Sequence, residues 1–550
     1  MSYHKDLRDY LDHLDRAGKL RRVGRRIDKD TELHPLVRWQ FRGLDEDERT
    51  GFLFDNLTGL KGLNYPSRVA TAIMAPSREV YAMGMMCSPA EISQKWSAAY
   101  ARPIEPRLVT TGPVKEEIHL GKNLLEHGGL DEFAIPMATN GWECLPRLTA
   151  VSWHSKDPDT GVVNVGTYNG LQLGPDRTNL RCGPGTHLVV HWQKCRKRGV
   201  PLQAAAVIGA VPAISMVSVA KVPYSVSELA VAGGIAGEPI DVVRCETIDL
   251  VVPATAEIVI EGEVPTDYME PDGASGEHTG YTIVGRRVFA FKVKAITHRK
   301  NPIWHDFISQ MPPSESSTIR GLAGEGRMTS FLRDGCGINQ VKDVAFHHCA
   351  GAWRICVIRF QDIAGVRTHE SVVWQALLAS QSIATDWPKM VIAVDDDIDP
   401  TDLESVFWAV TFRYQPHRDT RIIQGRGASL DQSSGSYSAS YEERRFPTGT
   451  TSPQGASSIL MDATRKWDYT PVSLPKKEYM ENAKRIWEEL GFPRLKPKAP
   501  WYGYDLGIWA EEDERLARLA EKGEFDKVAE ALMSKGRKLT PTDKVSGGME

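Results

Sequence analysis

Three features that this 550-residue sequence lacks argue against particular kinds of protein. None of its eight cysteines forms a C-x-x-C pair, which argues against a zinc ribbon and is typical of buried thiols in a reducing cytosol. Positive charge is not in excess, because 67 Lys and Arg residues stand against 71 Asp and Glu residues, so the charge balance does not point to a nucleic acid partner. The first twenty residues contain no apolar segment that could serve as a secretory signal.

The most apolar run of the chain also fails as a membrane span. It covers 204–220, AAAVIGAVPAISMVSVA, which is short for a bilayer, is interrupted by Pro212 and is rich in β-branched residues. We interpret it as buried strands. The sequence therefore predicts a cytoplasmic protein that contacts neither a membrane nor a nucleic acid.

Hydrophobic patterning predicts a mixed α/β protein of several domains. Leu7, Leu11, Leu14 and Leu20 give the first segment a helical apolar face, which Gly18 weakens near its end. Short strands dominate between 148 and 307 and predict a barrel or sandwich, whereas strands and helices alternate after 339, as in an α/β unit with parallel strands. We place an N-terminal α/β region at 1–125, a strand-rich region at 126–320, a second α/β region at 321–475 and a helical tail for oligomer contacts at 476–550.

An acidic loop between two predicted strands is the first candidate for chemistry. The stretch 252–284 begins with a β-branched run that predicts a buried strand, and a second strand is expected from 281 onwards. The loop between them carries Glu270, Asp272, Glu277 and His278. Carboxylates on a turn between core strands have a rigid frame and can reach a ligand. A solvated acidic loop is the alternative, and composition alone favours it.

Four further polar residues lie near the ends of predicted elements. The simplest interpretation of Asn164 and Asn169, in NVGTYNG, is that they form turns. His187 falls in the first turn of a helix predicted from about 186 to 199, where free backbone N–H groups favour an anion such as phosphate. Glu228 begins a helix of small residues, where the helix dipole alone can account for an acid.

Other groupings have weaker chemical interpretations. His187 and His191 have the i, i+4 spacing of a zinc pair, but no Glu follows His187 as in H-E-x-x-H. The aspartates at 395, 396, 397 and 399 follow a predicted strand and are interpreted as its solvated end. The Gly- and Ser-rich stretch 425–457 is predicted to be a functional loop or a subunit contact.

Four motifs in order along the chain resemble those of one enzyme family. They are NVGTYNG at 164–170, SELAVAGGIAGEPI at 227–240, DGASGEHTGY at 272–281, and KMVIAVDDDIDP at 389–400 with the following WAVTFR. Together they resemble the UbiD-type decarboxylases, which use prenylated FMN. The resemblance extends from the N-terminal helix to about Trp467. It implies a flavin-binding split β-barrel between α/β domains, with a C-terminal helical extension.

The resemblance also implies roles for particular residues. It identifies Asn164, His187 and Glu228 as ligands of the divalent metal that holds the cofactor phosphate. Two hard oxygens and one imidazole suit Mn²⁺ or Mg²⁺, and K⁺ is expected as well. The remaining residues that it implies for cofactor binding are Tyr168, Asn169, Thr186 and Lys389, the last as a point charge near the phosphate.

The family's catalytic Glu-Arg-Glu network is altered in this sequence. The arginine, five residues after the metal-binding asparagine, is Asn169 here, and the first glutamate is Asp272, whereas Glu277 is retained. Without a nearby cation, Glu277 is expected to be easier to protonate and so to act as general acid. Asp272 would tune it. Glu270, which precedes Pro271, is expected to face solvent.

These observations predict a reversible, non-oxidative decarboxylase of an aromatic carboxylic acid or its CoA thioester. Conversion of phthaloyl-CoA to benzoyl-CoA is the leading substrate hypothesis, although no CoA motif is visible. The alternatives are a decarboxylase or carboxylase of the hydroxybenzoate type, a non-catalytic UbiD-like subunit of a carboxylase complex, and an ordinary flavin oxidoreductase. The expected partners are a flavin prenyltransferase that supplies the cofactor and further copies of the chain, as a dimer or hexamer.

Overall fold

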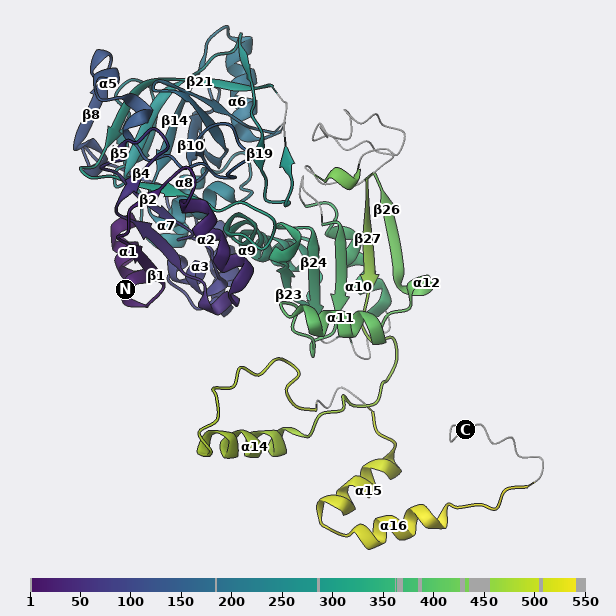
Figure 1. Ribbon diagram of the computed structural model, residues 1–550. Helices are drawn as coiled ribbons and strands as arrows, with labels where there is room; N and C mark the ends of the chain where they lie inside the picture. The colour runs from purple at the N-terminus through teal and green to yellow at the C-terminus, as the bar shows by residue number, and fades with distance from the viewer. Residues whose placement is uncertain are drawn as a thin grey trace.

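The computed structural model describes residues 2–183, 185–283, 287–361, 363, 369–383, 388–425, 431–434, 456–503 and 508–540. Within these residues the protein is a mixed α/β structure with a long curled sheet, as predicted (Figure 1). The predicted functional loop at 425–457 lies almost entirely outside the described residues. The domain boundaries at 125, 320 and 475 stay predictions.

The N-terminal region is built on a four-stranded sheet that takes in a strand from far along the chain. Its order is β1 (Leu20–Val23), β3 (Gly51–Phe54), β6 (Arg68–Thr71) and β22 (Ile303–Asp306). The accompanying helices are α1 (Leu7–Arg16), α2 (Leu33–Gly43), α3 (Arg78–Met85) and α4 (Ile92–Ala101). Because β22 pairs in parallel with β6, this region and the strand-rich region share one sheet.

The first helix ends earlier than its leucine pattern predicted. Helix α1 buries Leu7, Leu11 and Leu14, as expected. Gly18 then takes a positive φ of 70°, a conformation that glycine adopts readily, and Leu20 begins strand β1. Leu20 is therefore buried as predicted but belongs to a strand.

The central sheet contains ten antiparallel strands, of which β21 (Arg287–His298) is the longest. Its hydrogen-bonded order is β11 (Val163–Thr167), β10 (Ser152–Lys156), β14 (Leu202–Ile208), β17 (Ile258–Val264), β21, β13 (Arg177–Leu180), β12 (Gly170–Gly174) and β9 (Arg147–Leu148). β18 (Met269–Pro271) and β8 (Glu117–Leu120) also pair with β21. This curled sheet confirms the predicted dominance of strands between 148 and 307 and corresponds to the expected split barrel.

The apolar run 204–220 is half strand and half helix. Residues up to Ile208 belong to β14, as predicted, but α7 (Pro212–Val219) is a fully buried helix, so the interpretation of the whole run as strands was wrong. Pro212 occupies the first helical position, where its missing N–H costs no hydrogen bond. Among the described residues, no helix is long and apolar enough to cross a membrane.

Two helices and three small sheets surround the central sheet. Helices α6 (His187–Lys197) and α8 (Glu228–Ala236) begin where the sequence predicted. The small residues of α8 allow close packing, since a Cβ on Gly233 would lie 2.4 Å from the carbonyl oxygen of Ile104. The small sheets are β2 (Ile27–Asp28) with β4 (Leu57–Thr58) and β5 (Asn64–Tyr65), β7 (Arg107–Leu108) with β15 (Asp241–Arg244) and β16 (Val251–Pro253), and β19 (Ser275–Gly276) with β20 (Thr282–Ile283).

The C-terminal α/β unit follows helix α9 (Glu315–Ser330). Its five-stranded sheet has the order β23 (Val341–Phe346), β24 (Ile355–Phe360), β25 (Met390–Val394), β27 (Ser457–Asp462) and β26 (Thr420–Gln424). The strands β24, β25 and β27 run parallel, which confirms the predicted pairing. The helices of this unit are α10 (His369–Ala379), α11 (Leu403–Phe412) and the short α12 (Pro416–Asp419).

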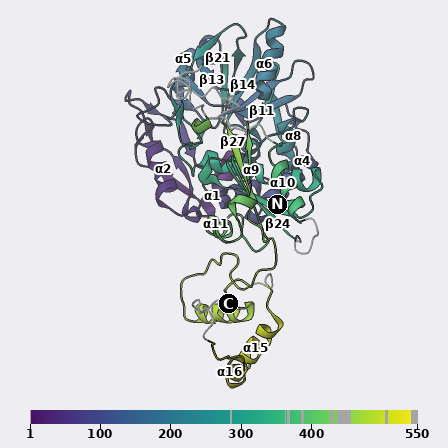
Figure 2. The same cartoon turned by 90° about the vertical axis from the view of Figure 1, so that its right-hand side faces the viewer.

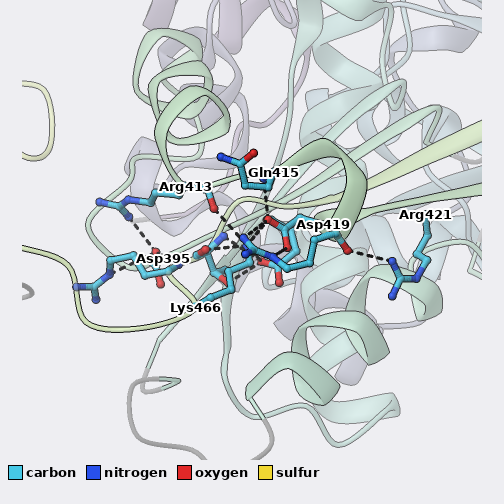
Figure 3. Close-up of polar contacts among 10 residues, drawn as sticks. Asp395, Arg413, Gln415, Asp419, Arg421 and Lys466 are labelled. Atoms are coloured by element: carbon cyan, nitrogen blue, oxygen red, sulfur yellow. Dashed lines mark hydrogen bonds and ion pairs between the residues drawn. The ribbon is translucent and has the colours of Figure 1, made fainter.

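Two of the four aspartates after β25 are buried, so their interpretation as a solvated strand end was wrong for these two. Arg413 donates to Asp395 at 2.9 Å and to both carboxylate oxygens of Asp397 at 2.7 and 2.6 Å. Lys466, which pairs with Asp419 at 3.5 Å, extends the charged network to α12 (Figure 3). Loss of one partner would leave a buried charge, at a cost of about 3–5 kcal/mol, so this network holds the end of the sheet.

The tail is helical, as predicted, and stands apart from the sheets. It contains α14 (Lys477–Glu489), α15 (Glu511–Glu521) and α16 (Phe525–Ser534). Figures 1 and 2 both show these helices away from the body of the molecule. Large apolar side chains are exposed on or next to α14 and α16: Tyr479, Ile486, Trp487, Leu490, Phe525, Leu532 and Met533.

Candidate functional site

Asn164, His187 and Glu228 converge from a strand and two helix starts. Asn164 is buried on β11, and the next residue, Val165, donates its backbone N–H to Oε2 of Glu228 at 2.8 Å. Nδ1 of His187 lies 3.7 Å from Oε1 of Glu228. The fold therefore brings the three residues implied as metal ligands to one place, although their role as ligands stays a prediction.

The donor set at this place fits a divalent cation. It offers an amide oxygen, an imidazole nitrogen and a carboxylate, all of which bind Mn²⁺ or Mg²⁺. Glu228 is 3% exposed, and a buried carboxylate requires a compensating positive charge or donor. A bound cation would supply that charge.

Tyr168 and Thr186 lie beside the same group. The hydroxyl of Tyr168 interacts with the side chains of Thr186 and Asn164. A Cβ on Gly166 would lie 2.6 Å from this hydroxyl oxygen, so glycine leaves the space that the Tyr168 ring needs. Thr186 is the N-cap residue of α6, where the first backbone N–H groups of a helix can bind an anion.

His191 does not share a ligand position with His187. Its Nδ1 is 3.0 Å from Oγ of Ser155, and burial lowers the pKa of His191 to about 4. Tyr224 lies edge-on to both imidazole rings and donates its hydroxyl to Asp157 at 2.6 Å. The structure therefore pairs His187 with Glu228, and His191 with Ser155.

The acidic loop closes around an arginine that the sequence reasoning had not singled out. Arg181 donates from Nη1 to Oε1 of Glu277 at 2.6 Å and from Nε to a carboxylate oxygen of Asp272. It also contacts the hydroxyl of Ser275 and the carbonyl oxygen of Gly273. Arg181 directly follows β13 and joins both carboxylates of the predicted catalytic set.

This arginine overturns the expectation that Glu277 lacks a neighbouring cation. Burial alone would raise the pKa of Glu277, but a hydrogen bond to His278 and the charges of Arg181 and Arg320 lower it to about 2. Glu277 is therefore ionised at neutral pH and is harder to protonate than predicted. The motif implied the cation at position 169, whereas in the structure Arg181 provides it.

Arg147 is a second arginine that contacts the acidic loop. Arg147 is 1% exposed and donates from Nη2 to the carbonyl oxygen of Ala274 at 3.3 Å. Glu143, 3.4 Å from Nε of Arg147, accepts the backbone N–H of Gly276 at 3.0 Å. The loop between β18 and β20 is thus tied to the start of β9 and to the residues just before it, which hold its carboxylates in place.

Glu270 is buried, so its predicted position toward solvent was wrong. It is 3% exposed and forms an ion pair with Arg177. Strand β18 pairs with β21, with Glu270 opposite Val288, and this pairing turns the side chain inward. Proline at 271 did favour an extended backbone, but pairing with β21 decided which face Glu270 occupies.

Helix α9 faces the acidic loop and carries one wall of an apolar pocket. Arg320 lies 2.7 Å from Nδ1 of His278. Ala323, Gly324 and Met328, further along α9, line the pocket together with Phe346 and Trp353 from outside the helix, and Lys221 and Arg327 also border it. A Cβ on Gly324 would lie 2.6 Å from Nε1 of Trp353, so glycine leaves room for the indole. The lining is mostly apolar, and the cavity of about 30 Å³ is smaller than an aromatic ring.

Lys389 lies in the C-terminal unit, just before β25. Its Nζ donates to Asp431 at 2.9 Å and to Oγ of Ser433 at 2.6 Å. The described contacts of Lys389 are therefore within its own unit, and its approach to a cofactor phosphate stays a prediction.

Family models match two consecutive parts of the chain. Residues 110–312 match the model of the 3-octaprenyl-4-hydroxybenzoate carboxy-lyase Rift-related domain, and residues 317–445 match that of the C-terminal domain of the same carboxy-lyase. An uncharacterised protein of Archaeoglobus fulgidus is 32% identical over 349 residues, which are 61% of this chain and 67% of that protein.

Solved structures of one enzyme class share the fold over most of the chain. The UbiD-class enzyme HmfF from Pelotomaculum thermopropionicum in complex with FMN is 29% identical, with a TM-score of 0.74 over 87% of this chain and 99% of that one. An evolved dimeric form of HmfF in complex with prFMN is also 29% identical, with a TM-score of 0.72 over 86% of this chain and 97% of that one. Vanillic acid decarboxylase of Sedimentibacter hydroxybenzoicus shares the fold. It is 23% identical, with a TM-score of 0.73 over 89% of this chain and 100% of that one.

Proposed function

The chain belongs to the UbiD family of carboxy-lyases, and we propose that it decarboxylates an aromatic carboxylic acid, or its CoA thioester, reversibly and without net oxidation. The observation that carries this proposal is the ion-paired loop in which Arg181 holds Asp272 and Glu277 together. Arg181 also donates its backbone N–H to the carbonyl oxygen of Asn169, which lies between β11, the strand that carries Asn164, and β12.

The proposed cofactor is prenylated FMN, which supplies an electron sink while carbon dioxide leaves. Asn164, His187 and Glu228 would hold Mn²⁺ or Mg²⁺ against its phosphate, with K⁺ as a further expected ion. The N-terminus of α6 and Thr186 add hydrogen-bond donors for the same anion. Support comes from the donor set of the site and from the flavin complexes of HmfF.

The protein's own residues would take up and donate the proton that the reaction requires. Glu277 is ionised before substrate binds, because its pKa is about 2. A substrate carboxylate that enters beside Asp272 and Glu277 adds a third negative charge, which favours uptake of one proton by the pair. Glu277 would then donate this proton to the carbon atom that loses carbon dioxide, so that R–COO⁻ and H⁺ give R–H and CO₂. In the carboxylation direction it would take the proton back.

The proposed aromatic substrate class is supported by the matched family model, which is named for a hydroxybenzoate carboxy-lyase. Phthaloyl-CoA stays the leading specific hypothesis, with an aromatic acid of the hydroxybenzoate type as the alternative. The hypothesis of a non-catalytic subunit rested on the loss of two of the three catalytic residues, the arginine and the first glutamate. Arg181 supplies an arginine beside Glu277, and Asp272 still stands in place of the glutamate.

We also propose that the protein acts as a homo-oligomer and receives its cofactor from a flavin prenyltransferase. Exposed apolar side chains on α14 and α16 support subunit contacts through the tail, because such side chains gathered on projecting helices favour a partner surface.

Exchange of labelled carbon dioxide tests the proposed reaction. Purified protein loaded with prenylated FMN and Mn²⁺ would be incubated with ¹³C-bicarbonate and a panel of aromatic acids and aromatic acyl-CoA esters. We expect label in the carboxyl group of at least one compound, and no label when the protein carries plain FMN. Fully loaded protein that exchanges no label with any compound of either class would overturn the proposal.

A further inference from the structure

A cluster of two buried histidines and a half-buried glutamate lies at the end of β21 opposite to the acidic loop. His298 is the last residue of β21, His119 lies on β8, and Glu132 ends the short 3₁₀ helix Gly129–Glu132. Arg287, near the acidic loop, begins the same strand. Eleven residue steps of about 3.3 Å separate the two strand ends, so the cluster is remote from the acidic loop.

Strand pairing places the two imidazoles on one face of the sheet. His119 is opposite Ile296 in the antiparallel β8–β21 pair, and His298 lies two residues further along β21. Such diagonal neighbours share a face and are within reach of long side chains. Glu132 reaches both rings: its Oε2 is 3.3 Å from Nδ1 of His119, and its Oε1 is 3.5 Å from Nε2 of His298.

The atoms that face one another in this cluster lack hydrogen-bond partners. Nδ1 of His119, Oε2 of Glu132 and Nε2 of His298 are all buried, and none has a hydrogen bond among the described residues. His119 and His298 are each 4% exposed. A buried polar atom without a partner costs about 1–3 kcal/mol, so three such atoms in one place require a ligand to compensate them.

The contact of Nδ1 determines the tautomer of the His298 ring. Nδ1 of His298 lies 2.8 Å from the carbonyl oxygen of Arg299, which can only accept, so Nδ1 carries the proton. Nε2 therefore presents a lone pair to the cluster. This arrangement, in which a backbone carbonyl orients an imidazole, is common behind metal-binding histidines. His127 stacks on His119 with ring centroids 4.0 Å apart, which holds the other imidazole in place.

We propose that His119, Glu132 and His298 form a second metal site that binds zinc. The ligand atoms all lie within 4.8 Å of one another. Zinc bonds to histidine nitrogen and carboxylate oxygen of about 2.0–2.2 Å place tetrahedral ligand atoms about 3.3–3.6 Å apart. Each histidine nitrogen lies at such a distance from one of the two oxygens of Glu132, at 3.3 and 3.5 Å. The fourth position is left for water. The ion would clamp β8 and the 129–132 turn onto the end of β21.

The donor chemistry separates this site from the proposed flavin site. Two imidazoles and one carboxylate favour zinc, whereas Asn164, His187 and Glu228 present one imidazole and two oxygens to a harder ion. The two sites share no residue, so a variant of one leaves the ligands of the other unchanged. This permits a test with matched controls.

Zinc binding by the full-length protein tests the inference. Protein stripped with a chelator would be given zinc alone, passed over a desalting column and analysed for metal per chain. We expect one retained zinc in the wild type and in Glu228→Gln, and at least about tenfold weaker zinc binding in Glu132→Gln. Glu126→Gln, an exposed neighbour on α5 (Lys122–Glu126), controls for the loss of a nearby negative charge and should retain zinc.

A cobalt spectrum keeps the test decisive if Glu132→Gln fails to fold. In Glu228→Gln protein loaded with Co²⁺, a four-coordinate site of this kind should give strong visible absorption, and added zinc should remove it. Retention of equal zinc by folded Glu132→Gln and wild type would overturn the inference. Failure of Glu228→Gln protein to retain zinc, or a weak spectrum typical of six-coordinate cobalt only, would do the same.

Discussion

Arg181 donates its backbone N–H to the carbonyl oxygen of Asn169 at 2.9 Å. The two residues face each other across the β12–β13 hairpin, in which Gln172 pairs with Thr178, so continuation of that register sets 169 opposite 181. The family's arginine position holds an asparagine here, and the residue across the hairpin is an arginine. The positive charge of the network is therefore present but comes from the adjoining strand.

Replacement of Arg181 should impair catalysis and change its pH dependence. In Arg181→Leu the carboxylates of Asp272 and Glu277 lose their shared cation, so the pKa of Glu277 rises from about 2. We expect the rate to fall by about 10²–10³-fold, as for loss of one preorganised donor. The limb of the pH–rate profile that reports Glu277 should move to higher pH.

Arg181→Lys is the matched control for charge. It keeps the cation but loses the forked geometry, so we expect partial recovery of the rate and a pH–rate profile nearer to that of wild type. The same linkage affects stability: ionised Glu277 stabilises the folded wild type above about pH 4.5, and this contribution is lost as the pH falls toward 2. An Arg181→Leu enzyme with an unchanged pH–rate profile would contradict this role.

Glu277→Gln should abolish turnover. An amide can neither donate nor regain the proton at the substrate carbon, and loss of a general acid typically costs about 10²–10⁴-fold in rate. Asp272→Asn should slow the reaction less, because it removes only a neighbour that influences Glu277. The measurement is CO₂ release by protein with equal flavin content. Turnover of Glu277→Gln within about tenfold of wild type would remove Glu277 from the mechanism.

Glu270→Gln should lower stability and leave the rate of the folded enzyme unchanged. The side chain is buried beside Arg177, and weakening this pair leaves polar atoms poorly compensated, which costs about 1–3 kcal/mol. Glu263→Gln, which disturbs the more exposed pair with Lys294, should cost about 0–1 kcal/mol. Urea unfolding of both variants measures the difference. Equal unfolding midpoints would show that burial of Glu270 contributes nothing.

Glu228→Gln should weaken binding of both metal and flavin while the protein stays folded. The glutamine oxygen can still accept the N–H of Val165, so the local hydrogen bond remains. A neutral ligand in place of an anionic one should lower affinity for Mn²⁺ by at least about tenfold, since ligand charge sets affinity for hard cations. Flavin absorbance and metal content report the result, and Glu238→Gln, exposed after the same helix, is the control. Wild-type flavin occupancy in Glu228→Gln would refute the metal assignment.

Local sequence signals predicted most of the secondary structure. At the candidate site they identified the group of Asn164, His187 and Glu228. Periodic apolar residues located α1, the strands of the central sheet and the parallel C-terminal unit. Gly199, after the basic last turn of α6, marked the end of that helix correctly, with a positive φ of 69°. The motifs identified Asn164, His187 and Glu228, which the fold brings together because each stands at a fixed position in a strand or helix start.

Relationships across the sheet were decided by the tertiary structure alone. Arg181 reaches Glu277 because hairpin register sets it opposite Asn169, and Glu270 is buried because β18 pairs with β21. The cluster of His119, Glu132 and His298 arises from three segments that adjoin only when β8 pairs with the end of β21. A sequence determines which side chains are available along each strand. Which of them meet depends on pairing between distant strands, and this is settled by burial and hydrogen bonding of the whole sheet.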